Sequence, residues 1–247
     1  MVDLQTKVIQ YGKDLGFDSI KIASSHPLHD VRDHLKNRLA KGIYSPFAKG
    51  DAAERTNPSR LLPGAKSVIM VAMSYGVDVA EPIIDPATAV GTLSRYARGQ
   101  DYHHVLGPKL NKLAQYLKEI DPNSETLPMV DTGPLAEKAF AYRAGLGVYG
   151  WNSCIITDTW GSWVFLGAVI TTISIKPHPF QAGTCQECGL CMEACPTGAI
   201  IAPYIIVPNL CLSQITQTRG IIPGRFKEAL GCRLFGCDTC QAVCPHN

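Results

Sequence analysis

The chain has 247 residues, a net charge of +2 and only 18% charged residues, so its composition does not require nucleic acid as a partner. This length allows one hydrophobic core and a smaller satellite domain. The longest apolar stretch, residues 164–175, is too short for a transmembrane helix, and the first residues lack the regions of a secretory signal. We therefore expect a cytoplasmic protein without a membrane partner.

The first part of the chain alternates between helical and strand patterns. Leu4, Val8, Tyr11 and Leu15 have helical spacing, and Gly16 is a suitable C-terminal cap. The apolar run 66–75 is typical of a strand buried on both faces. The predicted elements are a helix over 4–15, a strand over 17–23, a helix over 28–41, a loop with one helical turn over 43–62 and a strand over 66–75.

The same alternation continues to about residue 175 and predicts an α+β fold, in which helices cover a sheet. The later predictions are a Pro-rich loop at 81–86, a strand over 94–98, a helix from Asp101 to about 120, a strand over 128–131, a helix over 134–144, and a strand over 154–157 that pairs with 163–173 across a turn at 158–162. Residues 176–184 form a linker. We expect a domain over 1–178 and a cysteine-rich domain over 179–247.

Eight of the ten cysteines lie in residues 185–247. Their spacing is Cys185-x2-Cys188-x2-Cys191-x3-Cys195-Pro196, then Cys211, then Cys237-x2-Cys240-x3-Cys244-Pro245. The first run has the spacing of bacterial two-cluster ferredoxins, in which the fourth cysteine of a run ligates the other cluster. The pattern predicts a ferredoxin-like domain with two [4Fe–4S] clusters. The expected ligands are Cys185, Cys188, Cys191 and Cys244 for one cluster, and Cys237, Cys240, Cys195 and Cys211 for the other.

Zinc and disulfides are the alternatives for these thiols. Structural zinc modules usually separate two CxxC pairs, whereas this chain places four cysteines within eleven residues. Disulfides are not expected in a cytosolic chain, where dense cysteines more often bind metal. Cys154 and Cys232 are left over and read as ordinary small side chains.

The first domain has neither a G-x-G-x-x-G fingerprint nor a phosphate-binding P-loop. Several of its segments, and two in the cysteine region, nevertheless resemble the epoxyqueuosine reductase family. These segments are Leu62-Pro-Gly-Ala-Lys-Ser-Val-Ile69, Asp101-Tyr-His103, Val130-Asp-Thr-Gly133, Arg143-Ala-Gly-Leu-Gly147, Gly161-Ser-Trp163, Cys195-Pro-Thr-Gly-Ala199 and Gly236-Cys-Asp-Thr-Cys240. The resemblance extends from about residue 4 to the last residue.

The resemblance implies a cobalamin-binding first domain, two [4Fe–4S] clusters, and removal of the epoxide oxygen from epoxyqueuosine in tRNA during queuosine biosynthesis. In such a reaction a cofactor performs the difficult step, while the protein binds, orients and supplies a proton. Asp131 occupies the family's proton-donor position. The structural alternative for Asp131 is an Asx-turn, since a helix starting at Pro134 makes Gly133 the cap.

Five further residues are candidates for contacts with cobalamin. By resemblance, Tyr102 and His103 lie beside the corrin ring; a lone histidine there could equally be an ordinary surface residue. Arg95 could reach a polar group of the cofactor, or be a solvated strand residue. Lys138 could orient Asp131 or face water, and Asn152 could hydrogen-bond the cofactor edge.

Full-length members of the family continue past the last Cys-Pro in a helical-repeat domain that helps to hold tRNA, whereas this sequence stops at Asn247. The expected partners are therefore a low-potential donor such as ferredoxin or flavodoxin, and tRNA if the substrate is kept. The alternatives are an electron carrier, a corrinoid reductase, or a reductive enzyme for a small molecule other than tRNA.

Overall fold

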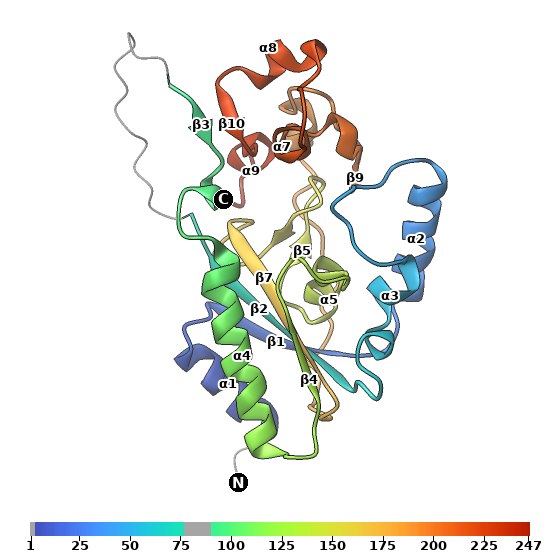
Figure 1. Cartoon of the computed structure of the whole chain (residues 1–247), viewed down its shortest axis with the longest axis vertical. Coiled ribbons are helices and arrows are strands. Elements are labelled where there is room, and N and C mark those ends of the chain that lie inside the picture. Colours follow the sequence, from blue (N-terminus) through green and yellow to red (C-terminus); the bar gives the residue numbers. More distant parts are fainter. Residues whose placement is uncertain (1–2, 77–89) are drawn as a thin grey trace.

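The structure, a computed structural model, describes residues 3–76 and 90–247, so the predicted loop at 81–86 lies outside the described residues. Its centre is a four-stranded antiparallel sheet with the order β1-β2-β7-β4 (Figure 1). The strands are β1 (Ser19–Ser24), β2 (Ser67–Ser74), β4 (Thr126–Met129) and β7 (Val164–Thr171). The two long strands, β2 and β7, form the middle of the sheet and pair along their whole length.

Strand β2 is buried on both faces, as the sequence predicts. Ile69 and Val71 belong to the apolar cluster on one face, while Val68, Met70 and Ala72 belong to the cluster on the other. This division follows from the period of two in a strand, which sends alternate side chains to opposite faces. An uninterrupted apolar run is therefore needed when both faces are covered.

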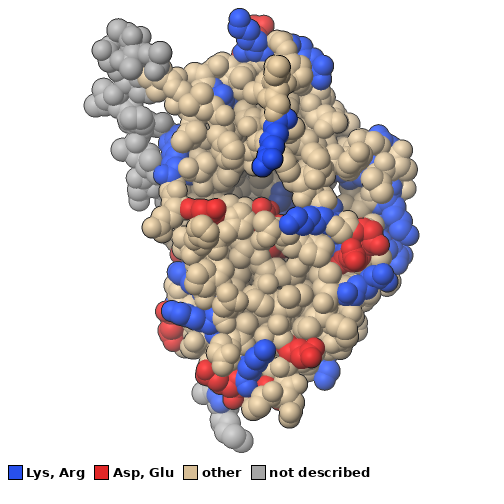
Figure 2. All heavy atoms as spheres, viewed as in Figure 1, with Lys and Arg blue, Asp and Glu red and all other residues tan. Residues whose placement is uncertain are grey.

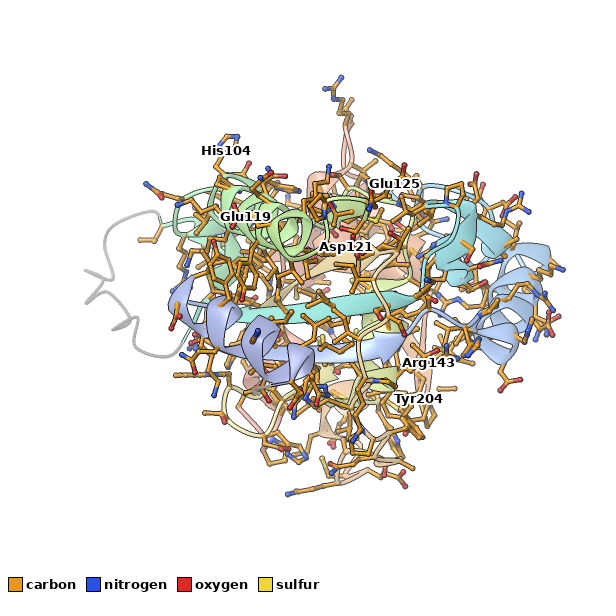
Figure 3. The ribbon with its side chains drawn as sticks, turned by 90° about the horizontal axis from the view of Figure 1, so that it is seen from below. His104, Glu119, Asp121, Glu125, Arg143 and Tyr204 are labelled. Carbon is orange, nitrogen blue, oxygen red and sulfur yellow. The ribbon has the colours of Figure 1, made fainter. Side chains whose placement is uncertain are left out.

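Two helices, α1 (Leu4–Asp14) and α4 (Tyr102–Ile120), cover one face of the sheet, and α5 (Glu137–Arg143) covers the other (Figures 1 and 3). The Asp101 side chain accepts a hydrogen bond from the N–H of His103 and caps α4, which follows Asp101 as predicted. Arg143, in the last turn of α5, donates to the backbone oxygens of His26 and Pro27 near the end of β1.

Beyond β1, the chain forms α2 (His29–Ala40), α3 (Ala52–Thr56) and the 3₁₀ turn η1 (Pro58–Arg60) at one side of the molecule. No residue of α2 is buried, and Leu39 is 60% exposed, so the apolar side chains of this helix are only partly covered. Several Lys and Arg side chains gather at this edge (Figure 2).

The cysteine-rich region has only short elements. They are α6 (Leu190–Glu193), β8 (Ile200–Ala202), β9 (Ile205–Ile206), η3 (Pro208–Leu210), α7 (Leu212–Gln217), η4 (Gly224–Phe226), α8 (Lys227–Leu230), β10 (Arg233–Phe235) and α9 (Thr239–Ala242). Helices α6 and α9, one from each cysteine run, pack together. Strand β10 pairs in parallel with β3 (Thr92–Leu93), which ties this region to the first part of the chain. None of the described helices is long and apolar enough to span a bilayer.

Three local predictions were wrong. Residues 94–98 are not a strand: β3 stops at Leu93, and the 3₁₀ turn η2 (Arg95–Ala97) follows. The segment 154–157 does not pair with 163–173 as a hairpin, because β6 (Ile155–Ile156) pairs with β5 (Val148–Tyr149) while β7 joins the main sheet. Helix α5 starts at Glu137 rather than Pro134, because the N–H of Ala136 donates to Arg55 O and residues 131–135 form an irregular turn.

Candidate functional site

Asp131 lies in a tight turn directly after β4. Its φ of +47° is in the left-handed region, which non-glycine residues seldom occupy. The N–H of Thr132 donates to Val130 O across it, which makes Asp131 the central residue of a γ-turn. Its side chain is 64% exposed. Such strained positions cluster at functional sites, where the surrounding structure maintains them.

Tyr102 and His103, in the first turn of α4, face Asp131. The Tyr102 hydroxyl donates to Asp131 Oδ2 over 2.7 Å, and His103 Nε2 lies 4.0 Å from the same oxygen. The Tyr102 ring stacks between His103 and Phe165, with centroid distances of 4.2 and 4.3 Å. Burial, and then the bond to Asp131, raise the pKa of Tyr102, so its hydroxyl remains a donor. The sequence-predicted Asp131, Tyr102 and His103 are therefore brought together.

Two buried polar atoms near this group, the Tyr96 hydroxyl and His103 Nε2, have no hydrogen-bond partner among the described residues. Burial, and then the negative charges of Asp238 and Asp131, together raise the pKa of Tyr96 to about 12, so Tyr96 lies within electrostatic reach of both carboxylates. Buried polar atoms without partners are costly, and a bound group commonly satisfies them. The surface is also hollowed between the cysteine region and the sheet (Figure 2). The side chains here thus fit a large ligand with polar edges.

Glu137, the first residue of α5, is a site residue that the sequence reasoning missed. Its Oε1 accepts a hydrogen bond from the N–H of Asp131 over 3.1 Å. Burial, and then the charge of Asp131, raise the pKa of Glu137 to about 8. A carboxyl group held neutral beside an exposed aspartate is typical of functional sites. The available signal was its position six residues after Asp131, directly after the apolar residues 133–136.

Replacing Glu137 with glutamine should remove a pH-dependent loss of stability. The pKa of Glu137 is about 8 in the folded chain and 4.5 for an ordinary glutamate, so the wild type loses stability as the pH rises from about 4.5 to about 8. We expect the stability of Glu137→Gln relative to wild type to increase by about 3 kcal/mol across this range, since one pKa unit corresponds to about 1.4 kcal/mol. Urea unfolding at pH 5 and pH 8 measures this, with Glu119→Gln as the exposed control. A difference in unfolding free energy between Glu137→Gln and wild type that is the same at both pH values would contradict this prediction.

Three other predicted site residues have partners within the chain. The Arg95 guanidinium donates to Gly76 O over 3.2 Å and lies 4.8 Å from the centre of the Trp163 ring. Lys138 Nζ donates to Ser153 O over 3.1 Å, and no bond to Asp131 is formed between these described residues. Asn152 is buried: its amide nitrogen donates to Cys240 O, while its oxygen accepts from the N–H of Cys154. Asn152 thus supports the cysteine region.

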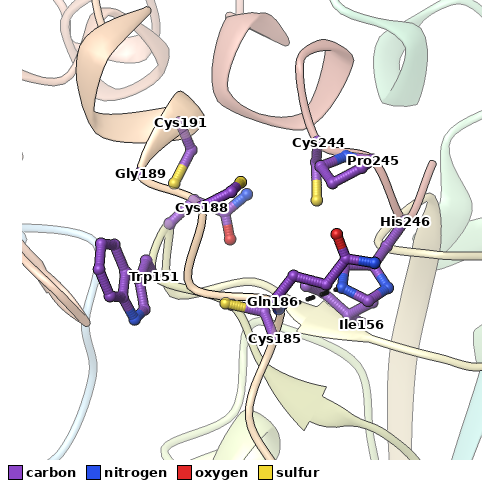
Figure 4. Close-up of a pocket in the computed structure, with 12 residues that line it drawn as sticks. Trp151, Ile156, Cys185, Gln186, Cys188, Gly189, Cys191, Cys244, Pro245 and His246 are labelled. Carbon is purple, nitrogen blue, oxygen red and sulfur yellow. Dashed lines mark hydrogen bonds between the residues drawn. The ribbon is translucent and has the colours of Figure 1, made fainter.

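Three cysteines of the first run and one from the distant second run line one pocket. Figure 4 shows the sulfur atoms of Cys185, Cys188, Cys191 and Cys244 around the same space, beside Trp151, Ile156 and His246. The pocket has about 320 Å³ of empty space, part of it open to solvent. Among the described residues, no three His, Cys, Asp or Glu side chains are close enough together to hold a single metal ion. In Figure 4 the four sulfur atoms instead stand apart.

The other four cysteines form a second group. Burial raises the pKa of Cys240, and its neighbours Cys154, Cys211, Cys237 and Cys195 raise it further. Burial also raises the pKa of Cys211, to which Cys237 and Cys195 contribute. These effects require the thiols to be close together. Cys195, Cys211, Cys237 and Cys240 are thus electrostatic neighbours, with the half-buried Cys154 beside them.

Cys195 differs from the rest of this group. Burial opposes ionisation of its thiol, but backbone N–H groups of Thr197, Ile200 and Ala199 lower the pKa of Cys195 below its usual value. The N–H of Ala199 donates to its Sγ over 3.2 Å. Such N–H donors stabilise a thiolate, which is the form that binds metals.

Asp238 connects the second cysteine group to the Asp131 region. It stands between Cys237 and Cys240, and its carboxylate accepts from the Ser94 hydroxyl and, over 2.8 Å, from the N–H of Arg95. Tyr96 follows directly. The loop that carries two cysteines is therefore bonded to the segment that presents the unpartnered Tyr96 hydroxyl. Sequence reasoning identified neither Asp238 nor Tyr96.

The fold and the two cysteine groups place the chain in the class of two-cluster iron–sulfur proteins. The family described as "Epoxyqueuosine reductase QueG, DUF1730" matches residues 55–132, and the "4Fe-4S double cluster binding domain" matches residues 184–247. An epoxyqueuosine reductase of Gloeobacter violaceus is 37% identical over 253 residues, which cover 100% of this chain and 77% of the relative. The chain belongs to the epoxyqueuosine reductase family.

A relative from Bacillus cereus is 40% identical over 99% of this chain but extends further, so the chain spans 64% of its length. Among solved structures, an epoxyqueuosine reductase in complex with an epoxyqueuosine-modified tRNA-Tyr stem loop is 37% identical. Its TM-score is 0.93, and the match covers 99% of this chain and 65% of that one. The mixed helix and sheet architecture is thus that of the family.

Proposed function

We propose that this chain reduces epoxyqueuosine in tRNA to queuosine, with a cobalamin and two [4Fe–4S] clusters as cofactors. The observation that carries the proposal is that Asp238, in the loop of Cys237 and Cys240, is hydrogen-bonded to Ser94 and Arg95, next to the unpartnered Tyr96 hydroxyl, which lies within electrostatic reach of Asp131. A reductive reaction that expels an oxygen needs a source of electrons and a proton donor at one place. The relative solved with an epoxyqueuosine-modified stem loop supports this choice of substrate.

For the clusters, we propose Cys185, Cys188, Cys191 and Cys244 as one ligand set, and Cys237, Cys240, Cys195 and Cys211 as the other. The shared pocket of the first set and the mutual effects on pKa in the second support this division. Each set takes its members from both cysteine runs, as in two-cluster ferredoxins. On this assignment, the domain of residues 179–247 stores electrons for the domain of residues 1–178.

For the corrinoid, we propose that Tyr102, His103 and Tyr96 face the bound cofactor. The unpartnered Tyr96 hydroxyl and His103 Nε2 fit a cofactor that has amide groups at its edge. Arg95 and Lys138 border the same region, but the described bonds hold both to the protein backbone. Asn152, which was also a candidate, is bonded to Cys240 O and Cys154 N, and we assign it to the support of the second cluster.

When bound, the corrinoid and the clusters supply the electron-rich centre and the electrons for the reduction. Overall, the epoxide takes up two electrons and two protons, a carbon–carbon double bond forms, and the oxygen leaves as water. The protein provides a proton for that oxygen, and Asp131 is the acid that projects from the turn into this region. Tyr102 fixes the orientation of the Asp131 carboxyl through its hydroxyl, while Phe165 and His103 hold the Tyr102 ring.

The proposed substrate also determines the partners and the cellular location that we propose for this chain. tRNA and a low-potential ferredoxin or flavodoxin are the proposed partners, in the cytoplasm. Of the first ligand set, Cys188 is exposed, so that cluster would lie close to the surface where a donor can approach. The basic edge at α2 offers positive charge for an RNA backbone (Figure 2).

Anaerobic reconstitution with iron, sulfide and cobalamin tests the proposed function. We expect the reconstituted chain to retain corrin absorbance through gel filtration and to form queuosine in tRNA when a strong reductant is supplied. If no corrinoid binds, the proposal fails. If a corrinoid binds but neither modified tRNA nor the free nucleoside reacts, the alternative of a reductase for another small molecule is favoured.

A further inference from the structure

The backbone of the Asp131 turn is held in a conformation that costs free energy. A φ of +47° is unfavourable for aspartate, and the turn contains only the short N–H contact from Thr132 to Val130 O together with the Thr132 hydroxyl bond to the same oxygen. Such a turn changes to a more favourable backbone conformation unless residues outside the turn restrain it. The position of the proposed proton donor therefore depends on neighbouring residues.

Two hydrogen bonds reach Asp131 from outside the turn. Tyr102 donates to the carboxylate over 2.7 Å, and the N–H of Asp131 donates to Glu137 Oε1 over 3.1 Å. The bond from Tyr102 orients the side chain but leaves the backbone free to rotate. The bond to Glu137 restrains the strained backbone itself.

Glu137 is well placed for this role because it begins α5, which packs against the sheet. The preceding N–H, that of Ala136, donates to Arg55 O over 2.8 Å and anchors the start of the helix. Three ionisable groups interact with the Glu137 carboxyl group. The charge of Asp131 raises the pKa of Glu137, and the charge of Lys138 lowers it. The charge of Glu137 raises the pKa of Tyr102. At neutral pH its carboxyl is neutral, so it accepts the N–H of Asp131 without repelling the Asp131 carboxylate.

We propose that Glu137 is a positioning residue that holds the Asp131 turn in its strained conformation, so that the Asp131 carboxyl is presented next to Tyr102. The inference rests on the proposed function only for its effect on turnover. Its effect on the turn itself is independent of any cofactor or substrate.

Variants that keep or remove the acceptor oxygen of Glu137 distinguish a specific restraint on the Asp131 turn from a general contribution of the side chain to packing. Glu137→Gln keeps an oxygen for the N–H of Asp131, whereas Glu137→Ala removes it, and Glu137→Met removes it at nearly unchanged side-chain length. We expect amide hydrogen exchange at Asp131 and Thr132 to be at least about tenfold faster in Glu137→Ala and Glu137→Met than in wild type, and unchanged within about twofold in Glu137→Gln. Glu119→Ala, on the exposed face of α4 (Figure 3), is the control and should match wild type.

The exchange is measured on the full chain by NMR or mass spectrometry. With the reconstituted protein, the variants without the acceptor should lose at least about tenfold in kcat with KM little changed, and glutamine should restore kcat. If exchange at Asp131 is as slow without the acceptor as with it, the inference is overturned, whatever the activity. If exchange responds as expected but the wild type does not convert epoxyqueuosine, the proposed function fails and the positioning role stands. If Glu137→Ala does not fold, Glu137→Met gives the same comparison.

Discussion

Asp131→Asn should lower turnover of epoxyqueuosine-modified tRNA by about 10² to 10⁴-fold, the usual contribution of a positioned general acid. Asparagine has nearly the same shape and can still accept the bond from Tyr102, but it cannot deliver a proton to the leaving oxygen. Corrin absorbance and iron content should stay at wild-type values, because no proposed ligand is altered. Single-turnover conversion by the pre-reduced protein is the appropriate measurement, since it is independent of the electron donor.

Glu119→Gln is the matched control for Asp131→Asn. It also removes one carboxylate, but from the exposed face of α4, and it should leave turnover within about twofold of wild type. Wild-type turnover by Asp131→Asn would exclude the aspartate as the proton donor and restore its reading as a structural turn residue. Tyr102, whose hydroxyl is 2.7 Å from the Asp131 carboxylate, would then be the next acid to test.

Cys195→Ser should remove the cluster proposed at Cys237 and Cys240, and not the cluster of its sequence neighbours. We expect the iron content to fall from about eight to about four atoms per chain, because one [4Fe–4S] cluster is lost. Serine is a poor substitute because the thiolate is the metal-binding form, and Cys195 has N–H donors that stabilise its thiolate. Iron and sulfide analysis after anaerobic reconstitution measures the loss.

Double variants show which cluster was lost. Adding Cys237→Ser to Cys195→Ser should cause no further loss of iron, whereas adding Cys188→Ser should remove nearly all of it. Cys232→Ser, at an exposed cysteine outside both proposed sets, is the control and should keep both clusters. The division of ligands is wrong if Cys195→Ser and Cys188→Ser lose the same iron, so that their combination is no worse than either one.

The parts of the fold that follow from local periodicity could be predicted from sequence. Helix α4 begins where Asp101 caps it, and β2 is buried on both faces because its apolar run is uninterrupted. The wrong predictions were those decided by distant partners. Residues 94–98 do not form a strand because Asp238, more than 140 positions later, accepts from the Ser94 hydroxyl and the N–H of Arg95. No local pattern contains that bond.

The same distinction applies to the site. The cysteine spacing predicts two groups because the geometry of a cluster is reflected in the distances between its ligands along the chain, and Cys185, Cys188, Cys191 and Cys244 do line one pocket. Glu137 and Tyr96 were missed because both were selected by properties of the folded chain. Glu137 was selected by its burial beside Asp131, and Tyr96 by its buried hydroxyl without a hydrogen-bond partner. The helix start at Pro134 was a reasonable prediction from capping preferences, but the contact of Ala136 with Arg55 moved it to Glu137.

Asp238 also has a consequence for how the protein matures. It lies between Cys237 and Cys240, which are proposed to bind iron, while its carboxylate accepts hydrogen bonds from Ser94 and Arg95, next to Tyr96. On this assignment, bound iron fixes the loop of residues 237–240, and the Asp238 bonds in turn fix residues 94–96. That segment presents the Tyr96 hydroxyl near Asp131. Loss of the cluster proposed at Cys237 and Cys240 should therefore also displace the Tyr96 hydroxyl, so that assembly of this cluster and placement of this hydroxyl are coupled.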